Sequence, residues 1–62
     1  MKVSEIIKLL ESKGWIQVRM RASHRQFKHP SKAGLVTVAG KPSVDVPSGT
    51  LNNILKQAGL KS

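Results

Sequence analysis

Residues 16–30 read IQVRMRASHRQFKHP, and two alternating runs within this stretch decide the fold. In residues 16–21, apolar side chains alternate with polar or charged ones, which is the period of a strand with one buried face. In the next run, residues 24–29, Phe27 lies on the inner side and His24, Gln26 and Lys28 lie on the other. The short break at residues 22–23 predicts a turn, so the two runs form a hairpin.

A third strand and a helix adjoin this hairpin. The segment from Pro30 to Gly34 breaks the second run, and residues 35–39, with β-branched side chains at 36–38, predict the third strand. Before the hairpin, apolar residues recur at helical spacing between a predicted N-cap at Ser4 and a closing Gly14. The sequence therefore predicts a helix ahead of three strands.

The C-terminal part predicts a loop and a second helix. Residues 40–48 form the loop, and Val44 and Val46 are expected to anchor it to the core. The helix that follows has apolar residues at positions i, i+3, i+4 and i+7, namely Leu51, Ile54, Leu55 and Ala58. Gly59 and Leu60 then predict a Schellman ending, in which the last leucine contacts Leu55.

The order helix, three strands, helix predicts an α+β domain in which both helices cover one face of a three-stranded antiparallel sheet. Side chains expected toward the helices are Ile16, Val18, Met20, Phe27, Val36 and Val38. Side chains expected on the open face are Gln17, Arg19, Arg21, His24, Gln26, Lys28 and Thr37. A slip of one residue at Ala22 and Ser23 would change this assignment.

Size and composition limit the possible functions. The chain has 62 residues, enough for a single domain over residues 1–62, and it has no cysteine for disulfides or thiolate zinc sites. Eleven Lys and Arg against three acids give a formal net charge of +8, which predicts an anionic partner: nucleic acid first, an acidic protein second, a membrane surface third. Without an apolar run of about 18 residues or a signal-peptide pattern, we expect a cytoplasmic location. Lysines expected to be merely solvated are Lys2, Lys8, Lys13, Lys56 and Lys61.

His24 is the candidate catalytic residue, because histidine moves protons near neutral pH and cations that attract phosphate surround this one. Such a site can cleave RNA without metal or cofactor, since RNA carries its own nucleophile in the 2′-hydroxyl. The candidate phosphate-binding residues are Arg19, Arg21, Arg25 and Lys28. Of these, Arg25 is expected on the opposite face of the strand from His24, because the two are adjacent in sequence. His29 is expected to be a packing residue at the strand end or, alternatively, a substrate contact or second proton carrier.

Other chemistries fit the sequence poorly. The carboxylates Glu5, Glu11 and Asp45 are too few for a catalytic metal site. Ser23 and His24 do not form a nucleophilic pair, because adjacent strand residues point to opposite faces. Trp15 is expected in the core rather than stacked on a base.

Over nearly all of its length, the chain resembles the HicA-type toxins of bacterial toxin-antitoxin systems. The resemblance rests on the order and spacing of several segments: SEIIKLLESKGW at residues 4–15, Ser23-His24 followed by residues 27–30, residues 36–38, and Gly49-Thr50-Leu51 leading to residues 54–60. The family has a fold like that of double-stranded-RNA-binding domains, so the resemblance implies that fold here.

The resemblance also implies a function. Members of the family are RNA-cleaving toxins, so it implies a metal-independent endoribonuclease acting on single-stranded mRNA, with His24 as the catalytic residue and no cofactor. It further implies a HicB-type antitoxin that covers the site. The family motif usually reads Gly-Ser-His, and this chain has Ala22 in place of the glycine. If the turn needs a positive φ there, alanine costs about 1 kcal/mol. Residues 39–41 also depart from the family, and no role is carried over to them.

Two other functions stay open at this point. A non-catalytic RNA-binding module with the same fold would bind RNA in a salt-sensitive manner, and His24→Ala would leave that binding unchanged. A pure protein-interaction domain would bind an acidic partner and show no affinity for RNA at low salt.

Overall fold

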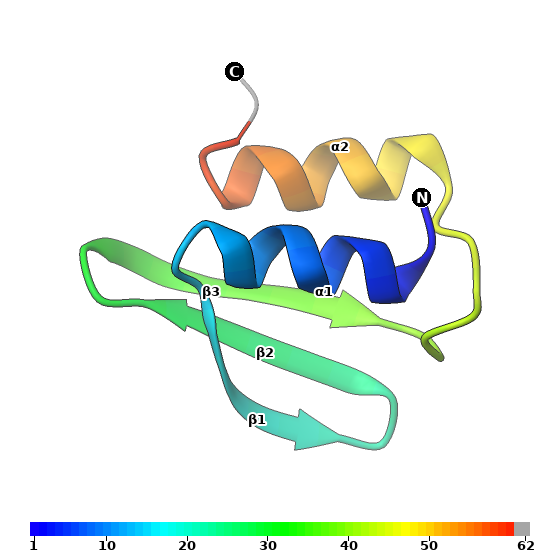
Figure 1. Ribbon diagram of the computed structural model, residues 1–62, viewed down its shortest axis with the longest axis horizontal. Helices are drawn as coiled ribbons and strands as arrows, with labels where there is room; N and C mark the ends of the chain where they lie inside the picture. Colours follow the sequence, from blue (N-terminus) through cyan, green and yellow to red (C-terminus); the bar gives the residue numbers. More distant parts are fainter. Residues whose placement is uncertain (61–62) are drawn as a thin grey trace.

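The computed structural model describes residues 1–60 and has the predicted order of a helix, three strands and a helix (Figure 1). The helices are α1, Val3–Ser12, and α2, Ser48–Gln57. The strands are β1, Ile16–Arg21, β2, His24–His29, and β3, Lys32–Ala39, which form one antiparallel sheet in the order β1-β2-β3. The α+β fold class is thus confirmed. Lys61, predicted to be a solvated lysine, lies outside the described residues.

The core lies between the two helices and one face of the sheet (Figure 1). Its buried side chains are Val3, Ile6, Leu10, Trp15, Phe27, Val36, Val38, Ile54 and Ala58. Phe27 pairs directly with Val36, and directly paired residues share a face, so this face of β2 and β3 is the helix face. His24, Gln26 and Lys28 alternate with Phe27 and lie on the open face, as predicted.

A β-bulge at Val18 changes which face the side chains of β1 occupy. Gln17 pairs with Phe27, and Arg19 pairs with Gln26, which leaves Val18 as an extra residue in β1. Gln17 therefore shares the helix face with Phe27, and its predicted place on the open face is wrong. The register slips inside β1 and not at the turn of residues 22–23.

The predicted burial of the apolar residues of β1 is also wrong. Ile16, Val18 and Met20 are 59%, 54% and 53% exposed. Both helices pack against β3, and Figure 1 shows β1 at the opposite edge of the sheet. Ile16 pairs with Lys28 and therefore lies on the open face, so its predicted direction toward the helices is wrong. Met20 does lie on the helix face, but the helices do not extend far enough across the sheet to cover it.

The connection between β1 and β2 is a two-residue turn of Ala22 and Ser23, as predicted, flanked by the pair Arg21 and His24. Ala22 has φ +53°, and it is the one non-glycine residue with positive φ in the described chain. A positive φ at the first central position alone is the pattern of a type II′ hairpin turn, which favours glycine at that position. Ala22 therefore occupies the position of this turn at which glycine is favoured.

Helix α1 begins earlier than predicted, with Lys2 rather than Ser4 as the N-cap. The backbone N–H groups of Val3 and Ser4 donate to the carbonyls of Val44 and Pro42 at 3.0 and 3.1 Å. The first N–H groups of α1, which have no partner within the helix, thus donate to carbonyls of the loop between β3 and α2 instead of to a capping side chain. The side chain of Val44 is 47% exposed and is not the predicted anchor. Val46 is the anchor, since it packs against the core as predicted.

Both helices end in a Schellman motif, which was predicted at Gly59, while Gly14 was predicted to close its helix; these glycines have φ +73° and +91°. At the end of α2, the N–H of Leu60 donates to the carbonyl of Leu55 at 2.9 Å. The other boundary that differs from prediction is the start of β3, which begins at Lys32 because pairing with His29 continues the ladder before residue 35.

Candidate functional site

Three exposed cations and an exposed histidine of the hairpin share one surface, which we call the basic face: Arg19, Arg21, Lys28 and His24. His24 lies between Arg21 on β1 and Ala39 on β3. Directly opposed residues have Cβ atoms about 5 Å apart, so Arg21 and His24 are neighbours. Arg19 pairs with Gln26, two positions along β2 on the same face.

The bulge at Val18 is the reason for this arrangement. In an unbroken ladder that continued from the pair of Gln17 and Phe27, Arg19 would lie opposite Arg25 and would share the helix face. The extra residue instead sets Arg19 opposite Gln26 and Arg21 opposite His24. The two arginines reach the open face by this irregularity, although simple alternation also predicted that face for them.

The ring of His24 is exposed, and within residues 1–60 no protein group forms a hydrogen bond with it. It begins β2 directly after the tight turn, so its backbone is held from both sides by β1 and β3. The imidazole is therefore open to an incoming ligand while its attachment to the sheet is fixed.

Arg25 is not brought to the basic face. It pairs with Met20 and Val38, which places it on the helix face, and its Nη1 donates to the carbonyl of Gly40 at 3.2 Å. The side chain is half-buried. This arginine holds the loop after β3 against the hairpin.

His29 packs at the end of β2 and lies far from His24. Its ring meets Trp15 edge-on at 5.2 Å between centroids, and Trp15 is buried in the core as predicted. The N–H of Ser31 donates to Nδ1 at 3.1 Å, so Nε2 carries the proton and donates to the carbonyl of Lys13 at 3.0 Å. Five strand residues separate the two histidines, about 17 Å, and they alternate onto opposite faces. These contacts agree with the packing interpretation of His29.

In the part of the chain that the structure describes, no three side chains of the metal-binding types lie close together. Neither described helix has the length and apolar character needed to cross a bilayer.

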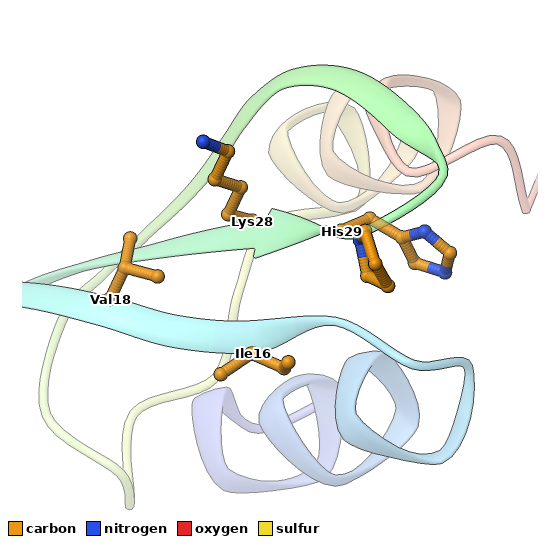
Figure 2. A pocket seen from close by; sticks show the side chains of 5 residues that line it. Ile16, Val18, Lys28 and His29 are labelled. Carbon is orange, nitrogen blue, oxygen red and sulfur yellow. The ribbon is translucent and has the colours of Figure 1, made fainter.

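The sequence interpretation missed a depression of about 350 Å³ at the end of the hairpin remote from His24 (Figure 2). Its lining residues are Ile16, Val18, Lys28, His29 and Pro30. Glycine inside a strand is the usual sequence sign of a bulge, and β1 contains none. Nothing in the sequence therefore marked Val18, which lines this depression, as the bulged residue.

Comparison with protein families identifies the family of this chain. A family model described as the HicA toxin of bacterial toxin-antitoxin systems matches residues 3–60 of the chain. No curated protein matches it significantly.

Proposed function

The chain belongs to the HicA toxin family of bacterial toxin-antitoxin systems, and from this premise we propose that it is a metal-independent endoribonuclease that cleaves single-stranded mRNA. Membership of the family implies an antitoxin as partner. We further propose that the antitoxin is of the HicB type and covers the basic face, and that both proteins act in the cytoplasm.

The observation that carries this proposal is the register that sets an exposed imidazole among three exposed cations on one sheet face. A phosphodiester bound beside His24 would have its negative charge neutralised by Arg19 and Arg21, while Lys28, further along β2 on the same face, would bind the neighbouring RNA backbone. His24 would lie beside it with both ring nitrogens available. The combination supplies charge stabilisation and proton transfer, the two needs of RNA cleavage.

In the proposed reaction, the substrate's 2′-oxygen attacks the adjacent phosphorus while the bond from phosphorus to the 5′-oxygen breaks. His24 takes the proton of the 2′-hydroxyl or delivers one to the leaving 5′-oxygen. Water carries out the other transfer, because His29 lies on the opposite face with both nitrogens in hydrogen bonds. Arg25 is left out of the proposed site, since its guanidinium bonds to Gly40.

The test compares wild type, His24→Ala and Gln17→Ala in cleavage of a single-stranded RNA. Gln17 is a matched control, because it is exposed in the same hairpin but lies on the helix face. Loss of a general acid or base lowers the rate by about 10² to 10⁴-fold, so we expect that loss for His24→Ala and a near-normal rate for Gln17→Ala. The products should carry a 2′,3′-cyclic phosphate and a free 5′-hydroxyl, and chelation of metals should not change the rate.

A substrate with a 2′-O-methyl group just 5′ of the cleaved bond should bind and resist cleavage. Cleavage of that bond, or a 5′-phosphate on the natural product, would show that water attacks the phosphorus and would refute the mechanism. If His24→Ala cleaved RNA at the wild-type rate, the catalytic assignment would be wrong. If no variant cleaved RNA but all bound it in a salt-sensitive way, the non-catalytic RNA-binding module would be the correct function.

A further inference from the structure

The bulge divides the open face of β1 into two ends of different chemistry. On the turn side of Val18, Arg19 and Arg21 lie opposite Gln26 and His24. On the other side, Ile16 lies opposite Lys28. One strand thus presents cations beside the imidazole and apolar side chains at the far end.

The far end is hollowed rather than flat. Figure 2 shows Ile16 and Val18 of β1 beside Lys28 and His29 of β2, around the depression described above. Its volume of about 350 Å³ is in the lower part of the range for small-ligand pockets, about 300 to 1,000 Å³. The walls are mostly hydrocarbon, and no carboxylate lines them.

Lys28 contributes two different parts to this site. Figure 2 shows its ammonium directed away from Ile16 and His29, while the residue still lines the depression. The aliphatic stem is therefore a wall, and the charge lies outside the hollow. A ligand that suits this arrangement has a flat apolar part for the hollow and an anionic group immediately beside it.

We propose that the depression binds one unpaired nucleobase of the RNA substrate, with Lys28 holding the phosphate next to that base. This inference rests on the proposed function. A base offers a π-face that packs on apolar side chains, and the phosphate that follows it supplies the negative charge. From His24 to Lys28 is four strand residues, about 13 Å, so the bound base belongs to a nucleotide flanking the cleaved bond rather than to the bond itself.

The proposal gives the RNA a path along the hairpin. The cleaved phosphate lies at the turn end among the arginines, and the neighbouring chain runs along the β1 and β2 ladder toward Pro30. Requiring an unpaired base in the hollow favours single-stranded substrate, because a base inside a duplex is stacked and paired.

The test measures binding of a non-cleavable RNA oligonucleotide with 2′-O-methyl sugars and one abasic site, placed at each position in turn. Stacking on an aromatic side chain is worth about 1 to 3 kcal/mol per base, and the mainly aliphatic walls here should give the lower end of that range, so one position should lose about fivefold in affinity when its base is removed. The double variant with Ile16→Ala and Val18→Ala removes two walls of the depression. In this variant, the loss of affinity caused by the abasic site at that position should shrink to about twofold or less. Met20→Ala is the matched control, because Met20 is equally exposed on β1 and does not line the depression.

Each outcome has a distinct meaning. An unchanged penalty in the double variant, or no sensitive position in an RNA that wild type binds, would overturn the base site and leave the proposed function intact. Normal RNA binding by the double variant with weakened antitoxin binding would assign the depression to the antitoxin and overturn the proposal. If wild type failed to bind RNA at low salt, the proposed function itself would fail, and the base site with it. Thermal midpoints check folding, and the single variants Ile16→Ala and Val18→Ala provide the same comparison if the double variant is unstable.

Discussion

Replacing Ala22 with glycine should make the protein more stable. Ala22 has φ +53° at the first central position of the turn between β1 and β2. An L-residue pays about 1 to 2 kcal/mol for a left-handed backbone, because its Cβ meets the neighbouring carbonyl oxygen. Glycine has no Cβ and avoids this cost.

The gain is partly offset in the unfolded chain. Glycine has more conformational freedom there than alanine, which lowers stability by about 0.4 to 1 kcal/mol. The difference leaves a net stabilisation between about 0 and 1.6 kcal/mol for Ala22→Gly, with a central value of about 0.8 kcal/mol. For a domain of this size, 1 kcal/mol corresponds to about 4 to 8 °C in the midpoint of thermal unfolding. At the central value, we expect the midpoint to rise by about 3 to 6 °C, as measured by circular dichroism.

The neighbouring turn residue supplies a control of opposite sign. Ser23 is in the same turn but has no positive φ, so Ser23→Gly gains nothing from relief of strain and keeps the entropic cost. It should lower the free energy of unfolding by about 0.4 to 1 kcal/mol. If Ala22→Gly were also destabilising, the strain argument for this turn would be refuted.

Three other predictions concern the charges and the glycines. Removing the charge of Arg19, Arg21 or Lys28 should in each case reduce the slope of log K for RNA binding against log salt concentration by about 0.7. Binding titrations at several ionic strengths measure this slope, and Lys8→Ala on α1 should leave it unchanged. Gly34→Ala should lower the free energy of unfolding by about 1 kcal/mol, because the residue has φ +85° although a Cβ there would meet no other atom. Gly14→Ala should lower it further, because its new Cβ would lie 2.9 Å from Nε2 of His29. Urea unfolding measures both. Equal losses would show that the His29 ring yields freely. Lys32→Met should lower stability by about 1 kcal/mol in the same assay, since the Lys32 ammonium donates to the carbonyl at the end of α2 at 3.0 Å. An unchanged midpoint would mean that this hydrogen bond contributes nothing.

Local sequence signals were sufficient where local geometry decides the structure. Gly14 and Gly59 close their helices because a left-handed residue at that point is needed for the Schellman hydrogen bonds. The alternation around Phe27 predicted which side chains of β2 meet the core. His24, Arg19 and Arg21 were correctly predicted to share a face.

The errors arose where distant parts of the chain decide the structure. Ser4 is a good cap residue, yet carbonyls nearly forty residues later in the sequence satisfy the first N–H groups of α1. The exposure of Met20 depends on how far two helices extend across a sheet, which a strand pattern does not encode. The bulge at Val18 changes the face of its neighbours without glycine or any other mark in the sequence.

The position of β1 at the edge of the sheet affects how copies of this chain behave toward one another. Within residues 1–60, β1 pairs only with β2, so one side of its backbone carries unpaired N–H and C=O groups that another strand could join. Bulges and charged side chains are the devices that keep such edges from associating, and β1 has both in Val18 and its two arginines. The cations proposed to hold RNA therefore also oppose pairing of this edge with the same edge of a second copy, because like charges would meet there. Salt that screens this repulsion weakens RNA binding and favours aggregation at the same time, so a concentrated stock of the isolated toxin is best kept at low ionic strength.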